Sequence, residues 1–160
     1  MNICGDAEAS GSLIQQSTDW SWILKDLEAT RALGRYLVQQ PDRPSLLLLE
    51  GTLGAGKTSL VQGMASAVGI DEPITSPTFA LAQHYPQGKP PLVHLDLYRL
   101  ELPAAADDLF LQEEEEAVGM GALLVVEWSE RLSLNLADAW RLKLCHHNDG
   151  GRLATLISKG

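Results

Sequence analysis

The residues best suited to chemistry form a glycine-rich segment, residues 51–58, which reads Gly-Thr-Leu-Gly-Ala-Gly-Lys-Thr. It fits the pattern G-x-x-x-x-G-K-[ST] at every fixed position, the pattern of a phosphate-binding loop, or P-loop. The glycines let successive N–H groups point at phosphate oxygens, and Lys57 adds a full positive charge. The predicted ligands are therefore ATP and Mg²⁺. The residues expected to bind the nucleotide here are Leu53, Gly54, Ala55, Gly56, Lys57, Thr58 and Ser59.

A magnesium site in such a protein also needs a carboxylate at the end of a neighbouring buried strand. Residues 122–127 read Ala-Leu-Leu-Val-Val-Glu, an apolar run that ends in an acid. The hydroxyl of Thr58 and the carboxylate of Glu127 are both hard oxygen ligands, which Mg²⁺ prefers. We predict that Thr58 and Glu127 hold the metal. The alternative is that Glu127 is an ordinary surface glutamate at the end of a strand.

A second acid lies in residues 94–100, which read His-Leu-Asp-Leu-Tyr-Arg-Leu. In a strand, alternation places His94, Asp96 and Tyr98 on one face. An acid and an imidazole with this spacing can orient a water molecule or support a metal's outer shell. A half-buried strand with a polar, exposed face would show the same pattern, and the residues alone leave both interpretations open.

A short loop with hydroxyl side chains, residues 75–79, reads Thr-Ser-Pro-Thr-Phe. Hydroxyls such as those of Ser76 and Thr78 can contact Mg²⁺ or the γ-phosphate and order a loop when ATP is present. A turn bounded by proline, with hydroxyls that cap it, is the alternative.

The elements that must position these groups surround the P-loop. Residues 46–50 are an apolar strand of the kind that is buried on both faces of a parallel sheet, and residues 57–68 form a helix that Gly69 ends. Residues 122–127 are a second buried strand. A P-loop needs this order, because its helix must start directly after a buried strand.

The rest of the chain predicts strands alternating with helices, with antiparallel additions. The fold class is therefore α/β of the P-loop NTPase type, with a mixed central β-sheet flanked by helices. We expect a flexible tail over residues 1–18 and a single P-loop ATPase domain over residues 19–160. The remaining expected elements are strands at 20–25, 78–85 and 92–97, helices at 26–40 and 103–118 (the latter one or two), and a hairpin of 139–146 with 153–158; the buried face of the first helix would comprise Leu27, Thr30, Leu33, Gly34, Leu37 and Val38.

Composition limits the possible functions. The 160 residues carry a formal net charge of −9, and no basic stripe is present to replace the counterions of nucleic acid. Independent binding of DNA or RNA is therefore disfavoured. Cys4 and Cys145 form no C-x-x-C pair, which disfavours a thiolate zinc site. The absence of a signal peptide or of a long apolar run predicts a cytoplasmic location without a membrane span.

Four motifs together resemble the TsaE (YjeE) family. They are the P-loop, Ser76-Pro77-Thr78-Phe79, the segment 94–100 and Val126-Glu127-Trp128, in this order and with this spacing. The resemblance covers about residues 26 to 158. It implies a P-loop fold with a mixed sheet that binds ATP with Mg²⁺ and hydrolyses it slowly when alone.

The resemblance also implies a role and partners. The family supplies the ATPase subunit of the bacterial machinery that makes N6-threonylcarbamoyladenosine at position 37 of tRNA. It works with the TsaB and TsaD proteins, and TsaD carries the carbamoyl-transfer site. ATP turnover is expected to reset that complex, and tRNA is reached only through it.

The resemblance extends to individual residues. It implies that Lys57, Asp96 and Glu127 are catalytic, that Thr58 and Glu127 bind metal, and that Ser76 and Thr78 form a switch-like loop. It also places Thr30 near the adenine, and brings Trp128 and Arg152 to the nucleotide; for Trp128, a place in the core is the alternative. This chain departs from the family pattern at Thr52, where the family usually has an acid, and at Ser129, where it often has proline.

Other classes remain as alternatives. A small-molecule kinase uses the same loop but usually has an arginine-rich lid, and here the arginines are dispersed. A GTPase switch would need Asn-Lys-x-Asp, and residues 135–138 (Asn-Leu-Ala-Asp) lack the lysine. A subunit that binds ATP without hydrolysing it also remains open. The run Glu113–Glu116 is interpreted as a solvated face or as a dock for a basic partner.

Overall fold

The computed structural model describes residues 14–16, 19–52, 54–148 and 150–157. Within these residues the helices are α1 (Leu27–Val38), α2 (Lys57–Ala67) and α3 (Pro103–Met120), with a 3₁₀ turn at Ser129–Arg131. The strands are β1 (Ile14–Gln16), β2 (Asp19–Leu24), β3 (Leu46–Gly51), β4 (Ala82–Tyr85), β5 (Leu92–Asp96), β6 (Leu123–Glu127), β7 (Trp140–His146) and β8 (Arg152–Ile157).

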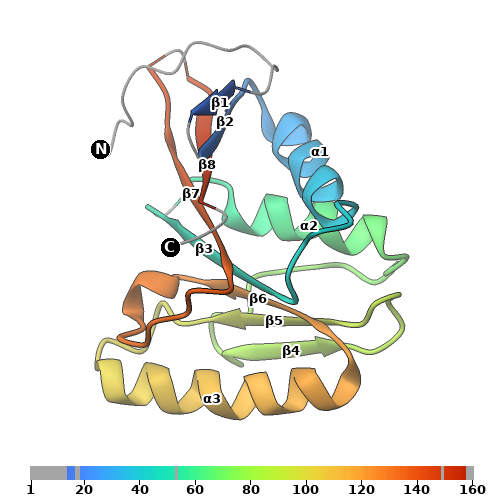
Figure 1. Ribbon diagram of the computed structural model, residues 1–160, viewed down its shortest axis with the longest axis vertical. Helices are drawn as coiled ribbons and strands as arrows, with labels where there is room; N and C mark the ends of the chain where they lie inside the picture. The colour runs from blue at the N-terminus through green and yellow to red at the C-terminus, as the bar shows by residue number, and fades with distance from the viewer. Residues whose placement is uncertain (1–13, 17–18, 53, 149, 158–160) are drawn as a thin grey trace.

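One mixed sheet contains all the described strands, in the order β1-β2-β8-β7-β3-β6-β5-β4 (Figure 1). The centre of the sheet is parallel and consists of β7, β3, β6 and β5. Antiparallel β4 extends one side, and antiparallel β8, β2 and β1 extend the other. The α/β class with a mixed central sheet is therefore confirmed. The P-loop follows β3, which lies between two parallel neighbours.

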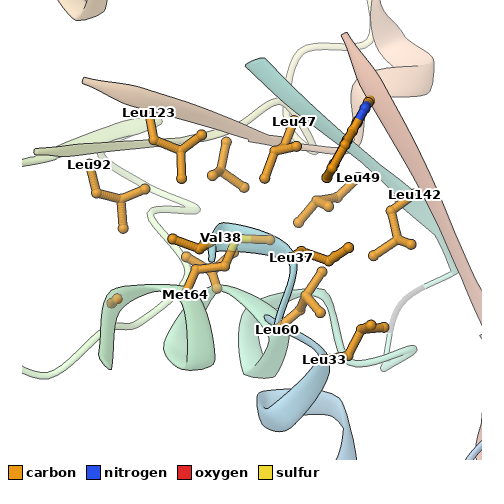
Figure 2. Close-up of a cluster of buried hydrophobic side chains, with 14 of the residues drawn as sticks. Leu33, Leu37, Val38, Leu47, Leu49, Leu60, Met64, Leu92, Leu123 and Leu142 are labelled. Carbon is orange, nitrogen blue, oxygen red and sulfur yellow. The ribbon is translucent and has the colours of Figure 1, made fainter. Parts of the chain in front are cut away.

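Alternation along the strands divides the core into two parts. The side chains of Leu47 and Leu49 on β3 face α1 and α2, whereas Leu48 faces α3. Figure 1 shows α2 and α3 on opposite sides of the strands β4 to β6. Figure 2 shows the first part of the core, which includes Leu33, Leu37 and Val38 of α1, Leu60 and Met64 of α2, and Leu92, Leu123 and Leu142 of the sheet.

The segment after the hydroxyl loop differs from its prediction. The strand expected from residue 78 begins only at Ala82, because residues 78–80 turn and the Leu81 N–H donates to the Pro77 carbonyl. Leu81 has a left-handed backbone with φ 69°, which a strand residue does not adopt. The Pro77–Leu81 turn therefore keeps Ser76 and Thr78 in a loop.

Within the expected flexible tail, Ile14–Gln16 pair with β2 as an edge strand; residues 1–13 and 17–18 lie outside the described part of the chain. Leu27, expected on the buried face of α1, is 48% exposed. The solvated-face interpretation of the acidic run is wrong at Glu113, which is buried and bonded to the His84 ring at 2.7 Å.

None of the helices in the described ranges is long and apolar enough to cross a membrane.

Helices α1 and α2 approach closely through two glycines. A Cβ atom added at Gly63 would lie 2.0 Å from the Arg31 carbonyl oxygen, and one at Gly34 would lie 2.2 Å from the Leu60 carbonyl oxygen. Real Cβ atoms do not approach backbone so closely, so the helices would have to separate. The P-loop leads directly into α2. The close crossing of α1 and α2 therefore fixes the position of the helix that follows the loop.

Replacing Gly63 by alanine is expected to destabilise the protein by about 1–3 kcal/mol, the usual effect of overpacking. Urea unfolding would measure it. Gly119→Ala is the matched control: Gly119 lies in α3 with nothing within 4 Å of an added Cβ, so alanine should stabilise by about 0.4–1 kcal/mol. Equal effects of the two changes would contradict the role of the crossing.

Candidate functional site

A pocket of about 370 Å³ lies at the carboxyl ends of β3, β5 and β6. In parallel sheets this is the edge at which ligands bind. Most of the residues that the sequence predicted as site residues come together here. The predicted residues that line the pocket are Gly54, Ala55, Gly56, Lys57, Thr58, Ser59, Ser76, Thr78, Asp96, Glu127 and Trp128.

Strand alternation brings the acids to the same side as the P-loop. On β5, Asp96 lies two positions after His94 and four after Leu92, which packs in the core part next to α1 and α2. On β6, Glu127 lies two positions after Val125 of the same core part. Asp96 and Glu127 are direct partners in the parallel ladder. Both carboxylates therefore emerge on the face where α2 begins.

The P-loop holds its lysine close to the backbone. Gly56, the residue before α2, has φ 103°, in the left-handed region that favours glycine. The Lys57 ammonium donates to the carbonyls of Gly51 at 2.7 Å and Thr52 at 2.9 Å. It also lies 4.5 Å from the ring centroid of Trp128, within the range of a cation–π interaction.

Lys57 is buried, with only 5% of the residue exposed. Burial lowers its pKa, and the negative charges of Glu127, Glu130 and Asp96 act in the opposite direction. Among the described residues, the hydrogen-bond partners of this buried cation are two backbone carbonyls, which it can exchange for phosphate oxygens.

The two predicted metal ligands are adjacent. The Thr58 hydroxyl lies 3.3 Å from Oε1 and 3.2 Å from Oε2 of Glu127. Glu127 is 3% exposed, so the alternative of a surface glutamate is wrong. Mg²⁺ in nucleotide sites uses one or two protein oxygens together with phosphates and waters, and this pair fits that need. No cluster of three His, Cys, Asp or Glu residues suited to a metal occurs in the part of the chain that the structure describes.

Asp96 is joined to the hydroxyl loop. The Ser76 hydroxyl donates to Oδ2 of Asp96 and lies 3.1 Å from the Thr78 hydroxyl. The backbone N–H of Tyr98 donates to Oδ1 of Asp96 at 2.9 Å. Asp96 and His94 are both buried, so the interpretation of β5 as a strand with an exposed polar face is wrong.

Two predicted nucleotide contacts, Arg152 and Thr30, are not among the residues that line the pocket. The Arg152 guanidinium donates to the Gly54 carbonyl at 2.9 Å, so it contacts the P-loop. Thr30 is fully buried, and it lies behind Gly56, where an added Cβ would be 3.5 Å from its Cγ2. Thr30 therefore packs against the P-loop from α1, and its position near an adenine stays a prediction. Leu53 lies outside the described residues.

Comparison with known families gives a match over most of the chain. Residues 24–154 fit the family model described as threonylcarbamoyl adenosine biosynthesis protein TsaE. The chain belongs to the TsaE family. The TsaE protein of Nostoc sp. is 42% identical over 134 residues, which cover 83% of this chain and 82% of that one. The TsaE protein of Synechocystis sp. is 46% identical over 114 residues, with 69% and 71% covered.

A solved structure supports the fold. The crystal structure of YdiB from Bacillus subtilis superposes with a TM-score of 0.68 and covers 94% of this chain and 90% of that one. Its sequence identity is 24%, so this likeness concerns the fold alone. The P-loop type of α/β fold is therefore shown both by the TsaE family model and by the arrangement of the sheet.

The two departures from the TsaE pattern have structural explanations. Thr52 is not among the residues that line the pocket, as expected for a side chain that points away from the phosphates. Ser129 is buried, and its hydroxyl donates to the Leu49 carbonyl at 3.2 Å. This bond ties the turn after Glu127 to β3, and it does so without a proline.

Two contributors to the site were not predicted as site residues, although strand alternation placed one of them, Tyr98, on the same face as His94 and Asp96. Tyr98 lines the pocket and its ring lies 4.9 Å from that of Trp128, so Trp128 is part of the site wall. Glu130 accepts a hydrogen bond from the Gly51 N–H at 3.3 Å. Desolvation raises the pKa of Glu130, whereas hydrogen bonds from backbone N–H groups and the charge of Lys57 act to lower it. No motif marks Glu130, because its importance comes only from its contact with the first P-loop residue.

Proposed function

We propose that this chain is the Mg²⁺-dependent, ATP-binding and ATP-hydrolysing subunit of the cytoplasmic machinery that makes N6-threonylcarbamoyladenosine at position 37 of tRNA. It acts with TsaB and TsaD, and its ATP turnover resets their complex. The family membership supports the pathway. The proposed chemistry is supported by one observation: Thr58 and Glu127 are in contact and line the P-loop pocket together with Lys57.

Each group in the pocket has a distinct task in this proposal. The P-loop amides and Lys57 bind the phosphates, and Thr58 with Glu127 would hold Mg²⁺. When bound, the metal neutralises charge that develops on the transferred phosphoryl group. Asp96, held by Ser76 and the Tyr98 N–H, would orient a water molecule or the metal's hydration shell. The Ser76–Thr78 loop can then respond to the presence of a γ-phosphate.

The pocket contains little positive charge for the reaction itself. Lys57 is the only basic residue among the described residues that line it. Arginines that stabilise the transition state are a hallmark of fast phosphoryl transfer, and a kinase would need them over its substrate. We therefore expect the isolated chain to hydrolyse ATP slowly and a partner protein to supply the positive charge that the pocket lacks. This composition disfavours the alternative of a small-molecule kinase.

Mixing the chain with TsaB and TsaD tests the proposal. The expected result is an ATP hydrolysis rate well above that of the isolated chain, because an arginine supplied by a partner raises turnover by about 10³- to 10⁵-fold. The threonylcarbamoyladenosine content of tRNA, measured in the same mixture, should rise over several rounds.

GTP competition and transfer of phosphate to a panel of metabolites are the controls for the alternatives. An ATPase rate that does not change on mixing would contradict the reset of the complex. Phosphorylation of a metabolite would favour the kinase.

A further inference from the structure

A buried histidine lies directly beneath the predicted metal site. His94 on β5 is 0% exposed and does not line the pocket. Its Nε2 atom is hydrogen-bonded to Oε2 of Glu127. Its other ring nitrogen, Nδ1, has no hydrogen-bond partner among the described residues. The ring therefore makes one polar contact, and it makes it with the carboxylate that would hold Mg²⁺.

The different surroundings of the two ring nitrogens indicate which of them donates a hydrogen. A buried N–H without an acceptor costs more than an acceptor that is left without a donor. The proton therefore belongs on Nε2, from which it is donated to Glu127. A carboxylate only accepts hydrogen bonds, so the roles of the two groups in this bond are fixed.

The contact restrains a side chain that few other groups hold. A glutamate has several rotatable bonds, and fixing them costs conformational entropy. The described hydrogen bonds to the Glu127 carboxylate come only from Thr58 and His94. Thr58 is itself a predicted metal ligand, so its hydroxyl would be shared with the ion. His94 is then the group that can hold the carboxylate whether or not the metal is bound.

We propose that His94 is a positioning residue that presents the carboxylate of Glu127 to the metal. This inference rests on the proposed function, because it assumes that Glu127 is a ligand of Mg²⁺. Asp96, two residues along the same face of β5, is held by other groups, namely Ser76 and the Tyr98 N–H. Strand β5 thus supports the metal acid and the hydroxyl loop through separate contacts.

Three substitutions separate positioning from packing. In His94→Gln the amide nitrogen can reach the place of Nε2, so the bond to Glu127 can be kept. In His94→Asn the amide lies nearer the place of Nδ1, and His94→Leu fills the space without a donor. His84→Gln is the control for loss of an imidazole, because His84 bonds Glu113 and lies outside the pocket lining.

The measurement is calorimetric affinity for a non-hydrolysable ATP analogue, with and without Mg²⁺. The natural chain, His94→Gln and His84→Gln should show the same gain in affinity on adding Mg²⁺. His94→Asn and His94→Leu should show a gain about 10- to 100-fold smaller, the usual effect of losing a group that orients a metal ligand. The affinity without metal should be unchanged in all four variants.

The outcomes distinguish this inference from the proposed function. If Mg²⁺ does not tighten binding to the natural chain, the metal assignment itself fails. If it does, and His94→Asn and His94→Leu gain as much as the natural chain, only the role of His94 is overturned. A parallel loss of metal-free affinity, or a failure of these variants to fold while His94→Gln also loses the gain, would make His94 a packing residue and overturn the inference.

Discussion

Replacing Lys57 by methionine is expected to lower the affinity for ATP by about 30- to 4,000-fold. The ammonium is buried and has backbone carbonyls as its hydrogen-bond acceptors. In the complex this ammonium would pair with the phosphates of ATP. Truncating one member of a buried charge pair costs about 2–5 kcal/mol, and each 1.4 kcal/mol is a tenfold change in affinity. Methionine keeps an unbranched apolar stem, which can still pack near Trp128.

Lys143→Met is the matched control, since it removes the same charge from an exposed position on β7. Calorimetric titration with ATP and Mg²⁺ would measure both variants, and thermal unfolding would check that each is folded. If Lys57→Met bound ATP as tightly as the control, the phosphate-binding assignment of the P-loop would be untenable.

Replacing Glu127 by glutamine should lower Mg²⁺-dependent ATP turnover by at least about 100-fold. A metal's stabilisation of transition-state charge is worth several kcal/mol, and each 1.36 kcal/mol changes the rate tenfold. Glutamine has the same shape but lacks the charge that a metal ligand supplies. In contrast, ATP affinity without Mg²⁺ should be unchanged or higher, because a negative charge near the phosphates has been removed.

The split between turnover and metal-free binding distinguishes loss of a metal ligand from general damage to the site. Glu101→Gln, which neutralises an exposed acid before α3, should leave both quantities at their natural values. A Glu127→Gln variant that kept its Mg²⁺-dependent turnover would remove Glu127 from the metal site.

Features encoded by adjacent residues could be predicted from the sequence. Strand β3, the P-loop and helix α2 are continuous in the chain, and therefore the glycine spacing and the buried apolar run were sufficient to predict them. Glu127 could be predicted for a related reason, since an acid directly after a buried strand reaches the edge where a P-loop lies. The alternation of His94 and Asp96 was also visible, but not the face of the sheet to which they point.

Predictions were less successful where a turn interrupts a periodic pattern. Residues 78–81 look compatible with a strand, but Pro77 and the left-handed Leu81 form a turn instead. Ile14–Gln16 carry no strong strand signal, and they are ordered by pairing with β2. A local turn decided the first segment, and pairing with a neighbouring strand decided the second, because the strand preference of both was weak.

By itself the sequence determined the phosphate-binding loop, its lysine and most of the succession of strands and helices along the chain. Each of these depends on residues that are neighbours in the chain. The tertiary structure decided which distant side chains meet: Ser76 with Asp96, His94 with Glu127, Arg152 with Gly54, and Glu130 with Gly51. These contacts depend on the order of strands in the sheet and on which face each strand presents to α2. That order results from packing the whole core, and it therefore places β5 and β6 side by side although α3 separates them in the chain.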